Sequence, residues 1–329
     1  MRTIQVSDIL AQAEKEQSVK IAFPRQLLSS IQIKGSYCFK PPSKSFSCGS
    51  WKYDCAIDKV VDVALVMSND SFHEKDYLNY RCFLKRALFM RHIATRLMEL
   101  TEDSPLGKLF EISYSYVGGN CLWPSVMLKT NDIKRFTFRL IPFFDRPTFK
   151  LSRFGNEISN LRIDENLVIS HFYNQSALAD LTSLDTQNRL DYLFSPKDET
   201  AANASLLNGL RLLKIWSKQR NDILSSGMQI NGYFWTLFIC FLLNTKRLNL
   251  LMTPLQVFKI TLQAFCDETL LGNGVHNISG STIKVLPELP PSNWQNCDVV
   301  LTDASGFCNY TAQMTKNQLE KVILSKHLI

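Results

Sequence analysis

The chain has 329 residues, of which 45% are hydrophobic and 20% are charged, and its formal net charge is +7 with a pI near 8.9. These values are typical of a globular protein with a sizeable core, and they exclude a chain too polar to bury one. The length suits two domains of roughly 150 residues each, and the mild basic excess permits a polyanionic partner such as RNA.

Composition also limits the kind of site and the cell compartment. The most apolar run, from Phe234 to Leu243, is too short to cross a bilayer, and the N-terminal residues carry charges throughout, unlike an apolar leader. The nine cysteines form no CxxC motif and no Cys/His group at zinc spacing. We therefore expect a soluble intracellular protein with free thiols, no membrane contact, no metal and no cofactor.

The first predicted elements surround a Gly-Ser pair. Residues 29–39 are predicted to form a strand that a turn at Gly35-Ser36 interrupts. Such a turn lets the backbone approach a phosphate closely, although a plain turn is its commoner role. Residues 40–51 are rich in Pro, Ser and Gly and are predicted to be a loop.

The next predicted strand, residues 59–67, carries a single carboxylate, Asp62, within a nearly continuous apolar run. Metal-dependent phosphoryl transfer requires a second carboxylate two residues further on, because that residue lies on the same face of the strand. The sequence has Ala64 there. A buried carboxylate is costly unless it is paired or functional. The strand therefore resembles half of a nucleotidyltransferase metal site.

The remaining elements of the first half complete a mixed sheet. We predict a helix over residues 76–100, a hairpin from residues 111–117 and 125–128, and a strand over residues 136–144. That last strand contains no carboxylate, although a neighbouring strand is where a third metal ligand is expected. On chemistry alone, the site lacks the ligands needed for catalysis.

The helix predicted over residues 76–100 separates basic from apolar side chains. Arg81, Lys85, His92 and Arg96 fall within an arc of about 60° at helical spacing. A solvated helix face is the commoner origin of such an arrangement, and a basic stripe that contacts RNA phosphates is the functional hypothesis.

Helical patterns dominate after residue 150. They cover residues 176–193, 201–220, 232–244 and 254–266, and a strand follows at residues 298–302. The sequence thus predicts an α+β protein with a mixed-sheet domain over residues 1–150 and a mostly helical domain over residues 151–329.

Five stretches in this order resemble the Nrap family, the nucleolar RNA-associated proteins of small-subunit ribosome assembly. They are Gly35-Ser36-Tyr37, VDVALVM at 61–67, EKDYLNYRCFLKRALFMRHIA at 74–94, LLKIWSKQR at 212–220 and VVLTDASGFCNYTAQMT at 299–315. The resemblance implies a nucleotidyltransferase-like domain followed by a helical domain of the poly(A)-polymerase/oligoadenylate-synthetase type. It also implies the loss of catalysis and a scaffold role in the small-subunit processome, bound to pre-rRNA and other processome proteins in the nucleolus of the nucleus.

On this resemblance, Gly35, Ser36 and Asp62 are vestigial site residues, and Arg81, Lys85 and Arg96 are the hypothetical RNA contacts. Family members are much longer, so the chain corresponds to their first module. Two alternatives remain open. One is an active RNA nucleotidyltransferase whose rearranged metal site recruits Asp54 or Asp58, and the other is a protein-binding adaptor without RNA contact.

Overall fold

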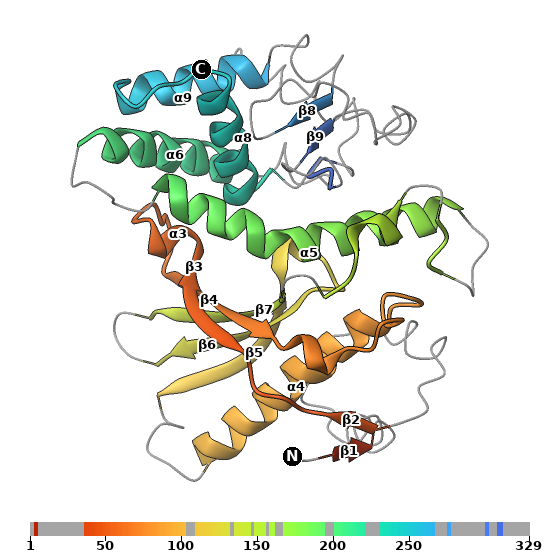
Figure 1. Cartoon of the computed structure of the whole chain (residues 1–329). Coiled ribbons are helices and arrows are strands. Elements are labelled where there is room, and N and C mark those ends of the chain that lie inside the picture. Colours follow the sequence, from red (N-terminus) through yellow and green to blue (C-terminus); the bar gives the residue numbers. More distant parts are fainter. Residues whose placement is uncertain are drawn as a thin grey trace. The chain divides into compact units, whose positions relative to one another are not determined.

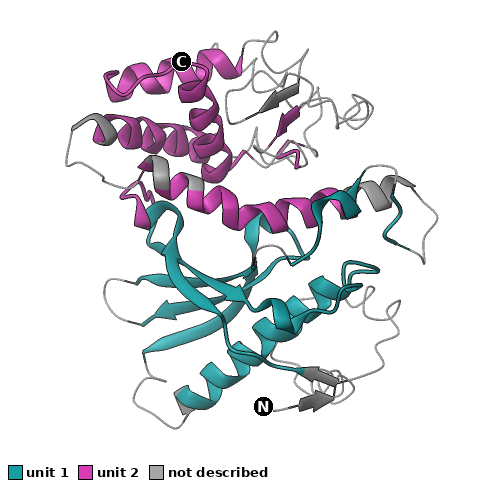
Figure 2. Cartoon of the chain, viewed as in Figure 1, with its two compact units in different colours: residues 1–51, 58–173 teal, residues 52–57, 174–329 magenta. Residues whose placement is uncertain are grey.

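The structure is a computed structural model, and it describes residues 3–5, 36–102, 109–131, 135–145, 148–155, 158–161, 167–194, 201–220, 230–266, 275–277, 300–302 and 308–311. The chain forms two compact units (Figures 1 and 2), residues 1–51 with 58–173 and residues 52–57 with 174–329. The predicted domain boundary at residue 150 stays a prediction, because compactness alone does not define a part of the chain that folds by itself.

A mixed five-stranded sheet forms the centre of the first unit (Figure 1), in the order β3-β4-β7-β6-β5. The central strands β4 (Val60–Met67) and β7 (Thr137–Phe144) are parallel, and every other neighbouring pair is antiparallel. The outer strands are β3 (Lys44–Cys48), β6 (Pro124–Thr130) and β5 (Phe110–Tyr116). The mixed sheet confirms the prediction from the sequence.

The composition of β4 and β7 explains their central position. Both consist mainly of β-branched, aromatic and other apolar residues, and the last four side chains of each strand are buried. The first half of β4 is only partly buried, and Asp62 lies in this half. The hairpin of β5 and β6 also forms as predicted, because Gly118 and Gly119 adopt the positive φ angles that its turn requires.

The segment predicted to be a loop contains β3, which pairs antiparallel with β4 from Lys44↔Val66 to Cys48↔Asp62. The first four residues of β3 are exposed or half-buried, and only Cys48 is buried. The strand therefore forms because β4 offers an edge with unpaired backbone groups, and its own composition gives no strand signal.

Helix α4 (Arg81–Glu102) packs against β5 and β6 (Figure 1). Its Phe83 and Phe89 side chains are fully buried, Phe83 beside Phe144 of β7 and Phe89 beside Phe39. It begins later than predicted, because Asn79 and Tyr80 have positive φ angles that a right-handed helix does not permit. The unit also contains a separate two-stranded sheet of β1 (Thr3–Gln5) and β2 (Ser36–Cys38). Short helical turns complete it: α3 (Gly49–Lys52), η1 (Asn69–Ser71), η3 (Val117–Gly119) and η4 (Leu151–Phe154).

The second unit is mostly helical, as predicted. Its helices are α5 (Leu167–Phe194, which belongs to this unit from Asn174 onward), α6 (Ala201–Gln219), α8 (Gly232–Asn244) and α9 (Pro254–Phe265). A short parallel pair of strands, β8 (Val275–Asn277) and β9 (Val300–Thr302), follows.

The ends and packing of these helices follow from their sequences. Asn231 caps α8 by accepting a hydrogen bond from the Phe234 backbone N–H, and Thr253 forms a capping box with Gln256 at the start of α9. Helix α8 is buried from Phe234 to Leu242 and lies at the core of the unit, while α6 packs closely against α9.

Candidate functional site

The Asp62 carboxylate lies on β4 directly opposite Arg139 of the neighbouring parallel strand β7. Arg139 Nε donates to Asp62 Oδ1 at 2.7 Å, and Arg139 Nη2 donates to Asp62 Oδ2 at 3.0 Å. The side chains are 16% exposed for Asp62 and 28% for Arg139. This is a bidentate, partly buried ion pair, the geometry in which arginine and a carboxylate bind most specifically.

Electrostatics supports the stability of this pair. Burial by itself lowers the pKa of the Arg139 guanidinium, but its hydrogen bonds to Asp62 and the negative charge of that carboxylate outweigh burial, so the pKa is raised. The arginine therefore carries a permanent charge, and both carboxylate oxygens face a cation that the chain itself provides. A divalent ion bound by Asp62 would have to displace this guanidinium.

The positions where further metal ligands are expected hold other residues. Ala64, two residues after Asp62 on β4, is fully buried. On the neighbouring strand the position opposite Asp62 carries a positive charge where a nucleotidyltransferase site would require a negative one. Within the described residues, no group of three His, Cys, Asp or Glu side chains is placed to hold a metal ion.

A second Gly-Ser pair, Gly49-Ser50, lies beside Asp62 and was not predicted from the sequence. Gly49 follows β3 with φ +71°, and a Cβ atom built on it would lie 2.7 Å from Asp62 Oδ2. Only glycine permits this close approach of backbone to carboxylate. The sequence does contain a signal for it, a Gly-Ser pair shortly before the Asp62 strand, but that pair lies within the segment predicted to be a loop.

The Gly-Ser pair chosen from the sequence has a different location. Ser36 is the first residue of β2 and pairs with Gln5 of β1, in a sheet separate from the one that contains Asp62. Gly35 lies outside the described residues. The assignment of Gly35 and Ser36 to the vestigial site stays a prediction.

Two of the three residues predicted from the basic stripe as RNA contacts form ion pairs with nearby carboxylates. Lys85 Nζ lies 2.6 Å from Asp76 Oδ2 and donates to the Ser71 carbonyl, and Arg96 pairs with Glu99 three residues further along α4. Arg81 is exposed at the first position of the helix. The role of the stripe in RNA binding stays a prediction, and Arg81 is the residue of the three best suited to it.

Arg86, which the helical pattern places among apolar residues, is fully buried. Its guanidinium carbon lies 4.9 Å from the centre of the Phe83 ring, 5.4 Å from that of Trp123 and 5.0 Å from that of Phe144. It also donates to the Leu122 carbonyl. Aromatic faces and a backbone acceptor stabilise the buried charge, so Arg86 packs the interior of the first unit.

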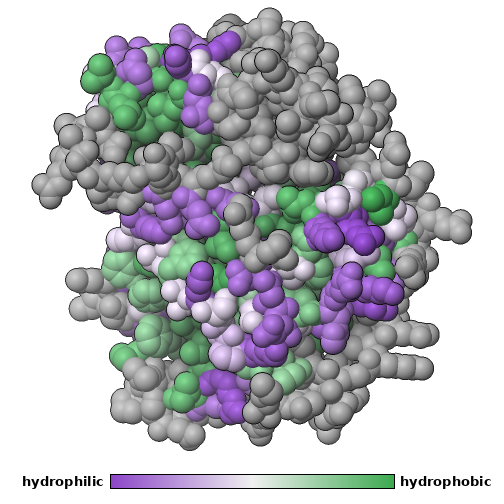
Figure 3. Space-filling view, in the orientation of Figure 1, coloured by the Kyte–Doolittle hydropathy of each residue, from purple (hydrophilic) through white to green (hydrophobic). Residues whose placement is uncertain are grey.

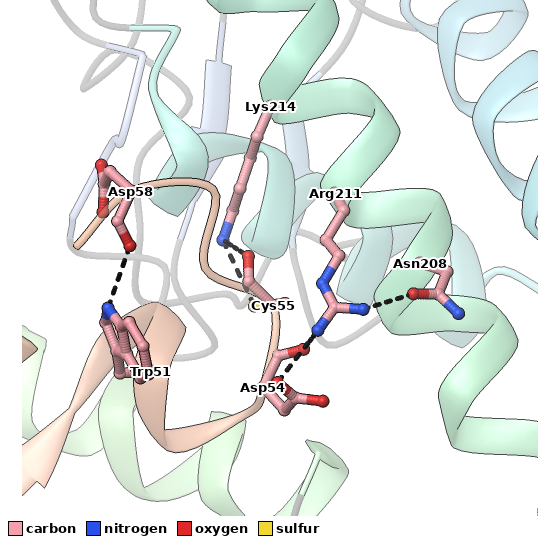
Figure 4. A network of polar contacts seen from close by, with 7 residues as sticks. All are labelled: Trp51, Asp54, Cys55, Asp58, Asn208, Arg211 and Lys214. Atoms are coloured by element: carbon pink, nitrogen blue, oxygen red, sulfur yellow. Dashed lines mark hydrogen bonds and ion pairs between the residues drawn. The ribbon is translucent and has the colours of Figure 1, made fainter. Parts of the chain in front are cut away.

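Two basic residues of α6 make polar contacts within the second unit (Figure 4). Arg211 lies 3.0 Å from Asp54 Oδ1, and Lys214 Nζ donates to the Cys55 carbonyl at 3.1 Å and lies 3.2 Å from Cys55 Sγ. Residues 52–57 belong to this unit, and Tyr53 and Cys55 are part of its hydrophobic core. These contacts give Lys214, which is buried, a structural role.

The fold defines the class of protein: it is an α+β protein in which a unit with a mixed sheet is followed by a mostly helical unit. The chain belongs to the Nrap family. The family model for Nrap protein domain 1 matches residues 3–195, and the model for the Nrap protein PAP/OAS-like domain matches residues 205–325. The resemblance found in the sequence is thereby confirmed, as is the predicted α+β class with a PAP/OAS-like helical domain.

Curated relatives carry the name nucleolar protein 6. The protein of Xenopus tropicalis is 29% identical over 330 residues, which cover 96% of this chain and 27% of the relative. The proteins of Mus musculus and Homo sapiens are 31% and 28% identical, and each match covers 88% of this chain and 25% of the relative. The chain thus spans about a quarter of the length of these relatives. Their names agree with the predicted nuclear and nucleolar localisation.

Among solved structures, the chain is similar to a cytoplasmic RNA terminal U-transferase, with 10% identity and a TM-score of 0.45 over 99% of this chain and 87% of the other. The Cid1 poly(U) polymerase has 10% identity and a TM-score of 0.47 over 99% and 88% of the two chains. Within the described part of the chain, none of the helices has both the length and the apolar character needed to span a membrane.

Proposed function

We propose that the chain is a non-catalytic, pseudo-nucleotidyltransferase module that acts as a scaffold in small-subunit ribosome biogenesis and binds pre-rRNA and other processome proteins. The observation that carries the non-catalytic part is the bidentate pair of Asp62 with Arg139. Membership in the Nrap family and the nucleolar names of the relatives support the biological setting.

The non-catalytic character follows from the charges of the groups around Asp62. Two divalent ions at a phosphoryl-transfer site need several carboxylate oxygens, because each ion must be held in a fixed position while the triphosphate adds further negative charge. Here the only carboxylate on β4 is already paired with a cation, and Ala64 offers no ligand. An arginine can bind a phosphate, but it does not activate a hydroxyl nucleophile as a metal ion does.

Asp54 and Asp58, which the alternative active nucleotidyltransferase would recruit as metal ligands, make other contacts. Asp54 belongs to the second unit, where it pairs with Arg211. Asp58 lies in the first unit, where its carboxylate accepts a hydrogen bond from the Val60 N–H and its carbonyl accepts one from Trp51 Nε1 at 3.1 Å (Figure 4). These contacts favour local structural roles for both aspartates.

The test is an incorporation assay. The full chain is incubated with each labelled nucleoside triphosphate, Mg²⁺ or Mn²⁺, and a single-stranded RNA primer. We expect no extension above the level without protein. Extension by the wild type that Asp62→Asn abolishes would show an active enzyme and overturn the proposal.

The scaffold part is tested separately by crosslinking in cells. We expect the chain to crosslink to pre-rRNA and to other small-subunit assembly proteins. Crosslinks to proteins alone would remove the RNA part of the proposal and favour a protein-binding adaptor.

A further inference from the structure

Three of the helices of the second unit, α6, α8 and α9, have a one-sided charge. Residues 201–220 and 230–266, which contain α6, α8 and α9, include no Asp and no Glu. The basic residues of these two segments are Arg211, Lys214, Lys218, Arg220, Lys246, Arg247 and Lys259. Arg211 and Lys214 make contacts inside the unit, whereas Lys246, just after α8, and Lys259, on α9, are exposed.

Exposed leucines accompany this charge at the connection from α8 to α9 and at the start of α9. Leu251 is 92% exposed, Leu255 is 54% exposed and Leu250 is 45% exposed. Leu255 and Lys259 are four residues apart on α9 and therefore lie on the same side of the helix. Figure 3 shows hydrophobic residues gathered beside hydrophilic ones in the region where Figure 1 places α9.

We call Lys246, Leu250, Leu251, Leu255 and Lys259 the leucine–basic surface. A single exposed leucine is ordinary, but three within six residues form an apolar group that water solvates poorly. The fold does not require it, because the core contacts of this segment are made by other side chains, such as the buried Leu248 and Val257.

We propose that the leucine–basic surface binds an acidic amphipathic segment of a protein partner. The apolar side of such a segment covers the three leucines, and its carboxylates pair with Lys246 and Lys259. RNA fits this surface less well, because sequence-tolerant RNA binding combines basic residues with aromatic stacking platforms and does not use aliphatic side chains. This inference rests on the proposed scaffold role and specifies one class of partner for it.

The test uses a fluorescent 18-residue peptide with leucine at positions 1, 4, 5, 8, 11, 12 and 15 and glutamate elsewhere as the probe, and fluorescence anisotropy with the full chain. We expect binding that weakens as salt increases, and at least a tenfold loss of affinity in Leu251→Ser/Leu255→Ser and in Lys246→Glu/Lys259→Glu. The matched control is Leu100→Ser, which changes a 62% exposed leucine of the first unit and should leave affinity unchanged. Circular dichroism confirms that each variant is folded.

Other outcomes overturn the proposal. Equal binding of a scrambled peptide of the same composition would show nonspecific association. Concentration-dependent dimers in light scattering that the leucine substitutions abolish would show a second copy as the occupant. Binding of a 20-nucleotide uridine RNA that charge reversal abolishes and leucine substitution does not would show RNA. The incorporation assay is independent of this surface, so an active enzyme would refute the proposed function without affecting peptide binding.

Discussion

Arg139 and Asp62 lie opposite each other on the parallel strands β7 and β4, and the guanidinium binds both oxygens of the carboxylate. The pair joins the two central strands of the sheet through their side chains in addition to the backbone ladder. It also places a fixed positive charge at the point where a metal-dependent site would collect negative charge. The same contact thus stabilises the sheet and opposes metal binding.

Removing the arginine should destabilise the first unit. Arg139→Ala leaves the Asp62 carboxylate, whose side chain is 16% exposed, without its cation. The cost should lie between that of breaking a surface ion pair and that of breaking a fully buried one. We expect a loss of about 2 kcal/mol in the free energy of unfolding, measured by urea denaturation.

Asp62→Asn, alone and combined with Arg139→Ala, completes a double-mutant cycle. The double variant should be more stable than the sum of the two single changes predicts, because neither charge is then left unpaired. Strict additivity would mean that the pair contributes no coupling energy.

Gly49 provides an independent test of how closely this part of the sheet is packed. Gly49→Ala places a Cβ atom 2.7 Å from Asp62 Oδ2 at φ +71°, whereas Gly119→Ala has a similar φ of +76° and no atom within 4 Å. We expect Gly119→Ala to cost about 1 kcal/mol from backbone strain alone, and Gly49→Ala to cost at least about 1 kcal/mol more. Equal losses in thermal or urea unfolding would show that the carboxylate moves aside freely.

The sequence is sufficient to predict the central strands and the hairpin, because long β-branched runs and a Gly-Gly turn are strong local signals. It is not sufficient for β3, whose Lys-Ser-Phe-Ser-Cys sequence resembles a loop and whose pairing depends on a strand that comes later in the chain. The position of Gly49 beside Asp62 depends on the same pairing. Strand pairing is a tertiary property, and local composition does not encode it.

For the candidate site, too, the sequence does not reveal which side chains contact one another. Asp62 stands out in the sequence because a carboxylate in an apolar strand needs a partner. That partner is Arg139, which only the register of the two strands brings to it. The helical pattern on α4 identifies basic residues, but it does not show that Lys85 pairs with Asp76, which precedes the helix. Charge patterns along one element do not reveal which charges the rest of the fold neutralises.

For RNA binding, Arg81 is the informative position of the predicted stripe. Arg81→Glu should weaken binding to single-stranded RNA and reduce the slope of log K against log salt by roughly 0.7 for each phosphate that the protein no longer neutralises. Lys85→Glu is a poor probe, because it leaves the buried Asp76 beside a second negative charge.

The matched control for Arg81 is Arg153→Glu, an exposed arginine of the same unit on η4. The measurement is a filter-binding titration at several salt concentrations. A slope that Arg81→Glu leaves unchanged, or one that Arg153→Glu reduces equally, would contradict a specific role for the stripe.

Thiol reactivity should separate exposed from buried cysteines. Burial raises the pKa of the Cys240 thiol to about 12, so at pH 8 only about one thiol in 10⁴ is the reactive thiolate. Cys121 is exposed. We expect a disulfide reagent at pH 8 to modify Cys121 rapidly and Cys240 only after unfolding in guanidinium, as mass spectrometry of the labelled peptides can show. Cys121→Ser should abolish the early modification of the peptide that contains residue 121, and early labelling of Cys240 in the folded chain would contradict its burial.

Gly209→Ala should destabilise the chain, although a glycine-to-alanine change within a helix usually stabilises a protein. In an open helical position the change stabilises by about 0.5–1 kcal/mol, because glycine loses more backbone entropy on folding. In α6, however, a Cβ atom on Gly209 would lie 2.6 Å from Val257 Cγ1 and 3.1 Å from the Pro254 carbonyl oxygen of α9. Overpacking of this kind costs about 1–3 kcal/mol, so we expect Gly209→Ala to destabilise the chain by about 1 kcal/mol in urea unfolding.

A second substitution shows whether the clash is the cause of that destabilisation. Val257→Ala removes Val257 Cγ1, which lies 2.6 Å from the new Cβ atom, but keeps Val257 Cβ, which lies 2.7 Å from it, so the change relieves part of the clash and should cost less stability in the Gly209→Ala background than in the wild type. The double variant should therefore be more stable than additivity of the two single changes predicts. Stabilisation by Gly209→Ala alone would instead show that α6 and α9 separate readily at this point. Only then could the added methyl group stabilise α6 without the cost of overpacking.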